Sequence, residues 1–119
     1  QKNYYDGDVK EAKALFLKIL EVEKIDKDII EESTFFISIC DIVLDNIQDA
    51  ISSLTKFLED YKKSKFTSMG LFFLGYSHFI NKDYDKSEKI LRKIKSDHPQ
   101  CKYMSEVDEI LTEIEKEKK

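Results

Sequence analysis

The chain has 119 residues, a formal net charge of −4, and 37% charged against 41% hydrophobic residues. Such a length predicts one domain, and three glycines and one proline suit an all-helical fold with solvated outer faces. Acidic and basic residues are interspersed without a basic stripe, which disfavours nucleic-acid binding, and no apolar run of about 18 residues predicts a transmembrane helix.

The N-terminal half is expected to hold the end of one helix and three further helices. Residues 1–6 resemble a helix tail, and Gly7-Asp8 a turn in which Asp8 caps a helix over residues 8–24. The inward face of that helix is predicted to comprise Val9, Ala12, Leu15, Phe16, Ile19 and Leu20. Residues 29–44 form a helix that is apolar nearly all round, which indicates cover on more than one side. A turn at Asp45-Asn46 leads to a helix over 47–61.

The C-terminal half is predicted to hold a helix pair and a closing helix. Apolar residues recur at three- and four-residue steps from Ser68 to Ile80, and a second helix runs from Tyr84 until Pro99 stops it. Gly75 lies inside the first helix, where glycine costs about 1 kcal/mol relative to alanine. We expect it to allow close approach of the small Ser87 on the facing helix. The closing helix spans about residues 103–117.

An internal repeat connects these elements. The small residues Ala12, Ala50 and Ser87 are 38 and 37 residues apart, and larger apolar residues follow each of them after four and seven positions. Such units bury their apolar faces by stacking, so the sequence predicts an all-α solenoid of antiparallel helix pairs. We expect a single domain with a partial repeat (1–28), two repeats (29–64 and 65–101) and a closing helix (102–119). The partial repeat and the non-methionine start at Gln1 suggest a longer natural chain.

The repeat resembles the tetratricopeptide family. Leu74-Gly75, the turn at Asp83-Tyr84, the small Ser87 and Pro99 match its pattern, while Ser38, Asp41 and Lys62 depart from it in the preceding unit. The spacing of 37 to 38 residues is similar to that of bacterial cell-envelope repeat proteins, such as the outer-membrane assembly lipoprotein BamD and the periplasmic CpoB type. The resemblance implies a non-catalytic scaffold in outer-membrane β-barrel protein assembly. It would lie on the periplasmic side, with any lipid anchor outside this segment.

The resemblance also implies a partner-binding surface on the concave side, formed by the first helix of each pair. The corresponding positions are Phe35, Ile39, Ile42, Met69, Phe72, Tyr76, Phe79 and Ile80, with Tyr4 at one edge and the acidic Glu106, Glu109 and Glu113 on the closing helix. Aromatic residues and methionine are enriched in protein interfaces, which favours a protein partner. In the alternative interpretation, neighbouring helices, a missing repeat or a homodimer partner cover this surface.

Little in the sequence indicates catalysis. His78 occupies a packing position and His98 a turn, and neither has a carboxylate pair or a cysteine at metal-ligand spacing. Cys40 and Cys101 form neither a metal motif nor a disulfide framework. We therefore expect a protein without enzymatic activity, cofactor or metal. Two alternatives remain: a cytoplasmic tetratricopeptide adaptor or co-chaperone that binds an apolar peptide or helix, and a repeat module of a larger protein.

Overall fold

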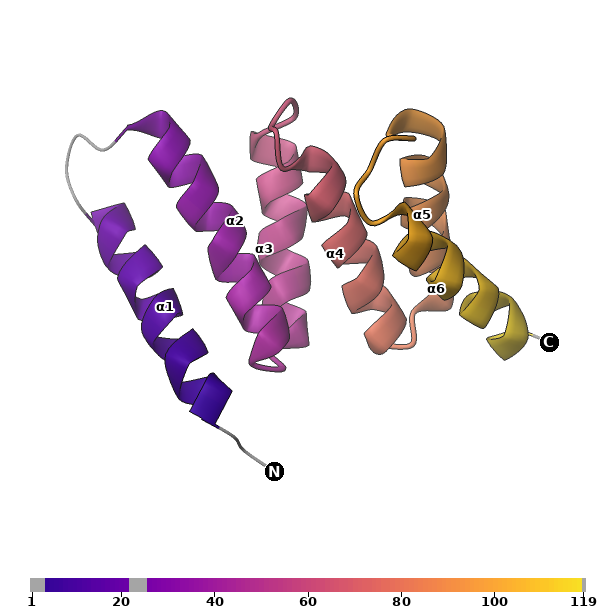
Figure 1. Cartoon of the computed structure of the whole chain (residues 1–119), viewed down its shortest axis with the longest axis horizontal. Helices are drawn as coiled ribbons and strands as arrows, with labels where there is room; N and C mark the ends of the chain where they lie inside the picture. Colours follow the sequence, from indigo (N-terminus) through magenta and orange to yellow (C-terminus); the bar gives the residue numbers. More distant parts are fainter. Residues whose placement is uncertain (1–3, 22–25, 119) are drawn as a thin grey trace.

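A computed structural model of the chain describes residues 4–21 and 26–118, and this part of the chain is all-helical (Figure 1). The predicted fold class is thereby confirmed. Its helices are α1 (Tyr4–Glu21), α2 (Lys27–Val43), α3 (Ile47–Asp60), α4 (Thr67–Ile80), α5 (Tyr84–Asp97) and α6 (Met104–Glu117).

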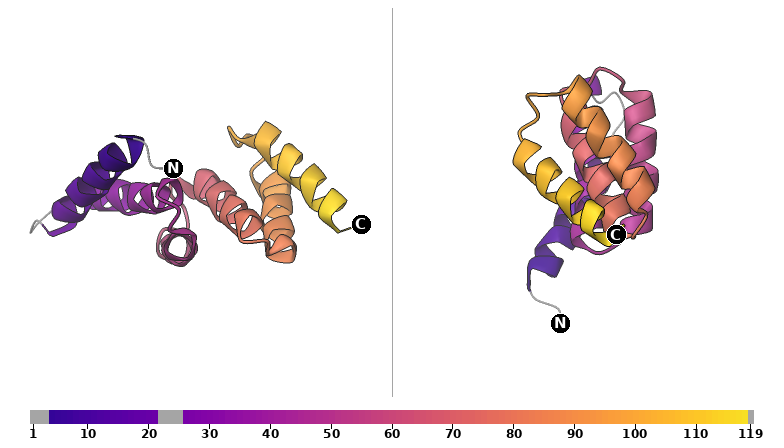
Figure 2. Two further views of the ribbon diagram at one scale, coloured as in Figure 1. Left: turned by 90° about the horizontal axis from the view of Figure 1, so that it is seen from below. Right: turned by 90° about the vertical axis from the view of Figure 1, so that its right-hand side faces the viewer.

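The helices stack in chain order, as a helical repeat requires. Each helix packs against the next along the chain, and α2 and α4 each also contact the helix two places further on, α4 and α6. In the left view of Figure 2, α2, α4 and α6 line one side of the stack, while α3 and α5 line the other. We call α2, α4 and α6 the first helices and α3 and α5 the second helices. The first helices all run downward in Figure 1, α2 and α4 from near the upper edge and α6 from about mid-height.

The buried faces of α3 and α5 follow the repeat. Their inward residues are fully buried and occupy equivalent positions 37 residues apart: Ala50, Leu54 and Phe57 in α3, and Ser87, Leu91 and Ile94 in α5. Leu54 and Phe57 belong to a hydrophobic cluster between α2, α3 and α4, and Leu91 and Ile94 belong to a second one between α4, α5 and α6. The spacing of the small and apolar residues thus places the core as the sequence predicts.

A close contact between α4 and α5 surrounds Gly75. A Cβ atom added there would lie 2.8 Å from Cδ2 of Leu91, and the buried Ser87 hydroxyl donates a hydrogen bond of 2.7 Å to the Gly75 carbonyl oxygen. In the preceding helix pair, α2 and α3, the equivalent close contact also involves a small residue. Ser38, 37 residues before Gly75, is fully buried and its Oγ lies 2.6 Å from Oγ of Ser53 in α3.

The predicted turn at Gly7-Asp8 is wrong, because α1 continues through both residues. The two equivalent positions, Asp45 and Lys82, do form turns, with positive φ angles of 65° and 63°. Gly7 has no positive φ angle, and none of the described atoms would lie within 4 Å of an added Cβ. One exposed glycine weakens a helix without ending it. A helix tail was expected at residues 1–6, before this turn. Its first three residues, 1–3, lie outside the described part.

The second correction concerns the inward face of α1. Leu15 was predicted to point inward but is 61% exposed, and Ala12, Phe16 and Ile19 are only half-buried. In α3 and α5 the equivalent face packs against the first helix of its own pair, whereas within the described residues α1 contacts no helix other than α2. Phe16 meets that helix through a stacked contact with Phe36, with ring centroids 5.9 Å apart.

Replacing Gly7 with alanine tests whether α1 continues. In an exposed helical position, alanine is favoured over glycine, so the free energy of unfolding should rise by about 0.5–1 kcal/mol. Urea denaturation followed by circular dichroism measures this change. A loss of stability would indicate the left-handed turn that the repeat pattern alone predicts at this position.

Candidate functional site

Two stacked pairs of aromatic rings, which we call the aromatic clamps, join successive first helices. Phe66, the N-cap residue of α4, stacks on Phe35 of α2 at a centroid distance of 4.7 Å. Tyr103, the N-cap residue of α6, stacks on Phe72 of α4 at the same distance. Both members of the second clamp lie 37 residues after those of the first. Offset stacking of this kind contributes about 0.5–1.5 kcal/mol beyond area burial, so the clamps fix the spacing of the first helices.

A lysine accompanies each clamp. The Lys65 ammonium lies 5.4 Å from the ring centroid of Phe66, and the Lys102 ammonium lies 5.4 Å from that of Tyr103. These lysines are again 37 residues apart. Both cations are therefore held over rings at the edge where α4 and α6 begin.

The clamps change the role of two residues that were predicted to bind a partner. Phe35 is 2% exposed and Phe72 is 6% exposed, so neither presents a surface. Their rings are covered by Phe66 and Tyr103, two aromatic residues whose contacts the sequence prediction did not include. Phe35 and Phe72 therefore belong to the core between the first helices.

A row of exposed and partly buried apolar side chains follows the first helices α2 and α4. It comprises Phe36, Ile39 and Val43 of α2, and Met69, Phe73, Tyr76 and Ile80 of α4. We call this set the first-helix stripe. Phe36, Ile39 and Val43 correspond to Phe73, Tyr76 and Ile80 after a shift of 37 residues, and the last member on each helix is the most exposed, at 52% for Val43 and 39% for Ile80. Residues three and four apart share one helix face, which explains the alignment.

The predicted binding residues divide between the stripe and the core. Ile39, Met69 and Tyr76 lie on the stripe, and like Ile42 and Phe79 they are partly buried and pack against the hydrophobic clusters. The side chain of Tyr4 lies outside the described part. Sequence reasoning missed Phe36, Phe73 and Val43. The 37-residue shift together with the three- and four-residue steps could have found them.

Two buried polar residues occupy another pair of equivalent positions, Asp41 and His78. Asp41 forms an ion pair of 2.5 Å with Lys13 of α1, which ties α1 to α2. Burial, reinforced by the Asp41 carboxylate, raises the pKa of the neighbouring Cys40 thiol and keeps it protonated. Cys40 and Cys101 are both buried free thiols.

Within the part of the chain that the structure describes, His78 has no such ion-pair partner. Ile51 stands where the repeat would place a counterpart of Lys13, 38 residues later, and among the described residues Nδ1 of His78 is buried without a hydrogen-bond partner. Burial lowers the pKa of His78, and this outweighs the opposing effect of the Asp83 carboxylate. The imidazole is therefore held neutral in the folded protein at neutral pH.

Replacing His78 with phenylalanine should remove a pH dependence of stability. Between the lowered folded pKa and the unfolded value of about 6.5, the unfolded chain binds more protons, so the stability of the unmodified protein falls as pH decreases below about 6.5. The phenylalanine variant should lose this slope, and a control with His98→Gln should keep it. Urea denaturation between about pH 5 and pH 7 measures the difference. Equal slopes in both variants would assign the pH dependence to other groups.

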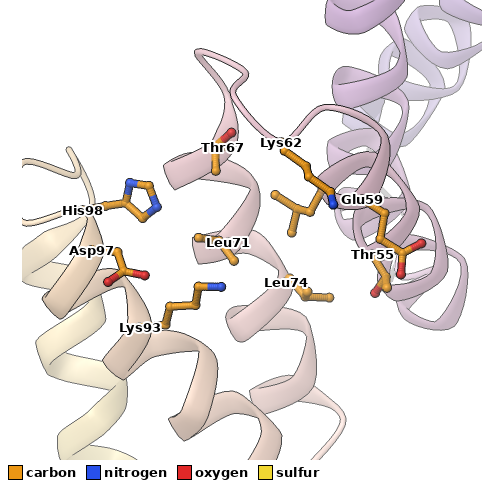
Figure 3. A pocket seen from close by; sticks show the side chains of 10 residues that line it. Thr55, Glu59, Lys62, Thr67, Leu71, Leu74, Lys93, Asp97 and His98 are labelled. Atoms are coloured by element: carbon orange, nitrogen blue, oxygen red, sulfur yellow. The ribbon is translucent and has the colours of Figure 1, made fainter.

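The opposite side of the stack carries a groove of about 600 Å³ between α3 and α5 (Figure 3). Leu58, Leu71 and Leu74 give it an apolar lining, and charged side chains of both signs stand along its two walls. Its two threonine hydroxyls already bond the backbone: Thr55 donates to the Ile51 carbonyl, and Thr67 accepts from the Ser64 amide. The groove therefore offers an apolar slot and no activated nucleophile.

No family model matches the chain, and no curated protein matches it significantly in sequence. Among the described residues there is no cluster of three or more side chains suited to hold a metal ion. No helix in this part of the chain is long and apolar enough to cross a membrane.

Proposed function

We propose that this protein is a non-catalytic scaffold of the tetratricopeptide type, which binds another protein through the first-helix stripe. The observation that carries the proposal is the recurrence of partly buried or exposed apolar residues at equivalent positions of α2 and α4. A surface that repeats in register suits a partner segment that crosses both helices, because the segment meets similar side chains on α2 and on α4. Aromatic residues and methionine, which the stripe contains, are enriched in protein interfaces.

We further propose that the scaffold acts in the bacterial cell envelope, as a BamD-like accessory subunit of outer-membrane β-barrel protein assembly. The repeat spacing of 37 to 38 residues and the linkers at Asp60–Ser64 and Asp97–Cys101 support this. The protein would lie on the periplasmic side of the outer membrane, with any lipid anchor outside this segment. A cytoplasmic adaptor would use the same stripe, so the two proposals differ in location and partner.

Neutral polar substitutions at the exposed end of the stripe test the scaffold function. Val43→Asn combined with Ile80→Asn should reduce partner capture about tenfold while leaving the fold intact, since both side chains are largely exposed. The assay is affinity capture by the tagged full-length protein from solubilised envelopes, with partners identified by mass spectrometry. Recovery of β-barrel assembly components would support the envelope version, and their absence would contradict it.

Leu15→Asn is the matched control, because it removes an exposed leucine on α1 away from the stripe. It should leave capture unchanged. If it instead abolished capture or converted a dimer into a monomer, measured by light scattering, the interface would lie on α1 and the stripe proposal would be wrong.

A further inference from the structure

On α6, the residues equivalent to the first-helix stripe are mostly acidic instead of apolar. The same 37-residue shift that relates α2 to α4 places Glu106, Ile110, Glu113 and Glu117 on α6. Ile110 is buried, and the three glutamates are exposed. On α2, the position equivalent to Met69 of α4 is occupied by the exposed Glu32, 37 residues earlier. All charged residues at these equivalent positions are therefore acidic.

Among the described lysines close to α6, Lys116 alone pairs with one of these three glutamates. Lys118 is held by Asp85 at 2.6 Å and by Glu88 at 2.8 Å, and Lys95 is paired with Asp108. Within the described residues, Lys116 lies 3.4 Å from Glu113, whereas Glu106 and Glu117 have no cation within 4 Å. The ion pairs of α6 thus concentrate on α5 and leave the stripe side with excess negative charge.

Helix direction adds to this charge at one edge. The first helices run in the same direction, so the C-terminal ends of α2, α4 and α6 lie along the lower edge in Figure 1. Helix C-termini carry partial negative charge, which favours a nearby cation. At the opposite edge Lys65 and Lys102 are held over their aromatic rings. The edge beside Val43, Ile80 and Glu117 is therefore the more favourable one for positive charge.

We propose that the partner segment is a cationic amphipathic helix, whose apolar residues lie on the stripe of α2 and α4 and whose lysines or arginines meet the glutamates of α6. This inference rests on the proposed function and names the chemistry of the partner. Charge complementarity selects the partner and its orientation, while the apolar contacts supply most of the affinity.

A pair of synthetic peptides tests the inference. Both are fluorescently labelled helices of about five turns with the same leucine positions, and their polar face carries either lysine or glutamate. Fluorescence anisotropy with the full chain should give at least tenfold tighter binding of the lysine peptide at about 0.05 M salt, and a smaller difference at about 0.3 M salt.

Charge-neutralising variants locate the effect. Glu106→Gln, Glu113→Gln and Glu117→Gln together should abolish the preference for the lysine peptide. The control is Glu11→Gln, Glu21→Gln and Glu59→Gln, which changes the net charge equally at exposed positions off the stripe and should keep the preference. If both triple variants lost the preference for the lysine peptide equally, the net charge of the protein would explain the preference, and the inference would be overturned.

Two further outcomes separate this inference from the scaffold function. If both peptides bind equally and Val43→Asn with Ile80→Asn weakens them equally, the stripe binds its partner without charge selection, and only the inference fails. If neither peptide binds, the inference fails, and the apolar stripe fails with it as a helix-binding surface.

Discussion

Replacing Gly75 with leucine is expected to lower the free energy of unfolding by about 3 kcal/mol, because the larger side chain overpacks the contact between α4 and α5. Even the first side-chain carbon would lie 2.8 Å from Cδ2 of Leu91, a residue that is itself fully buried. Separation of α4 from α5 would also break the hydrogen bond from Ser87 to the Gly75 carbonyl. The gain in helix propensity, about 0.8 kcal/mol, offsets only part of this loss.

Gly7→Leu is the control for this substitution. It makes the same chemical change within a helix, but the described atoms around Gly7 leave space for a side chain. We expect Gly7→Leu to be neutral or stabilising in urea denaturation. Similar stabilities for the two leucine variants would show that the close approach of α4 and α5 at Gly75 is not essential to the fold.

The second large effect is expected at the Lys13–Asp41 ion pair. Lys13→Met leaves the buried Asp41 carboxylate without its partner, and loss of one member of a buried pair costs about 3–5 kcal/mol. Lys13 itself is 26% exposed, so water screens part of the interaction, and we expect about 2–3 kcal/mol. Thermal and urea denaturation at neutral pH measure the loss.

A double variant separates the ion pair from simple packing. Lys13→Met combined with Asp41→Leu removes both charges, so the stability should return to within about 1 kcal/mol of the unmodified protein, since apolar replacement of a buried pair is often neutral. If Lys13→Met alone cost less than about 0.5 kcal/mol, the pair would not be what holds α1 on α2.

Much of the fold follows from the spacing of small and apolar residues. Ala50 and Ser87, with the apolar residues four and seven positions after them, are buried where the repeat pattern places them. The pattern succeeds in α3 and α5 because each of these helices is covered by its own first helix and by the next one. It fails at Leu15, because among the described helices α1 contacts only α2 and periodicity alone does not reveal which neighbours are present.

The candidate site was predicted less completely than the fold. Family alignment identified the first helices and Tyr76 but placed Phe35 and Phe72 on the surface, where two aromatic rings in fact cover them. Phe66 lies outside the predicted helices, and the periodicity of the closing helix does not show which ring Tyr103 meets, so tertiary structure decides both contacts. The isolated Nδ1 of His78 was likewise inaccessible to sequence reasoning, because it depends on the absence of a polar group opposite.

Site-specific photo-crosslinking in the native cell tests most directly the claim that partners bind on the first-helix stripe. A photoreactive phenylalanine analogue is placed at Tyr76 on the stripe or, as a control, at the exposed Lys89 on α5. We predict a discrete adduct with a partner protein from position 76 and none from position 89. An adduct from position 89 alone, or no adduct from position 76, would contradict the account.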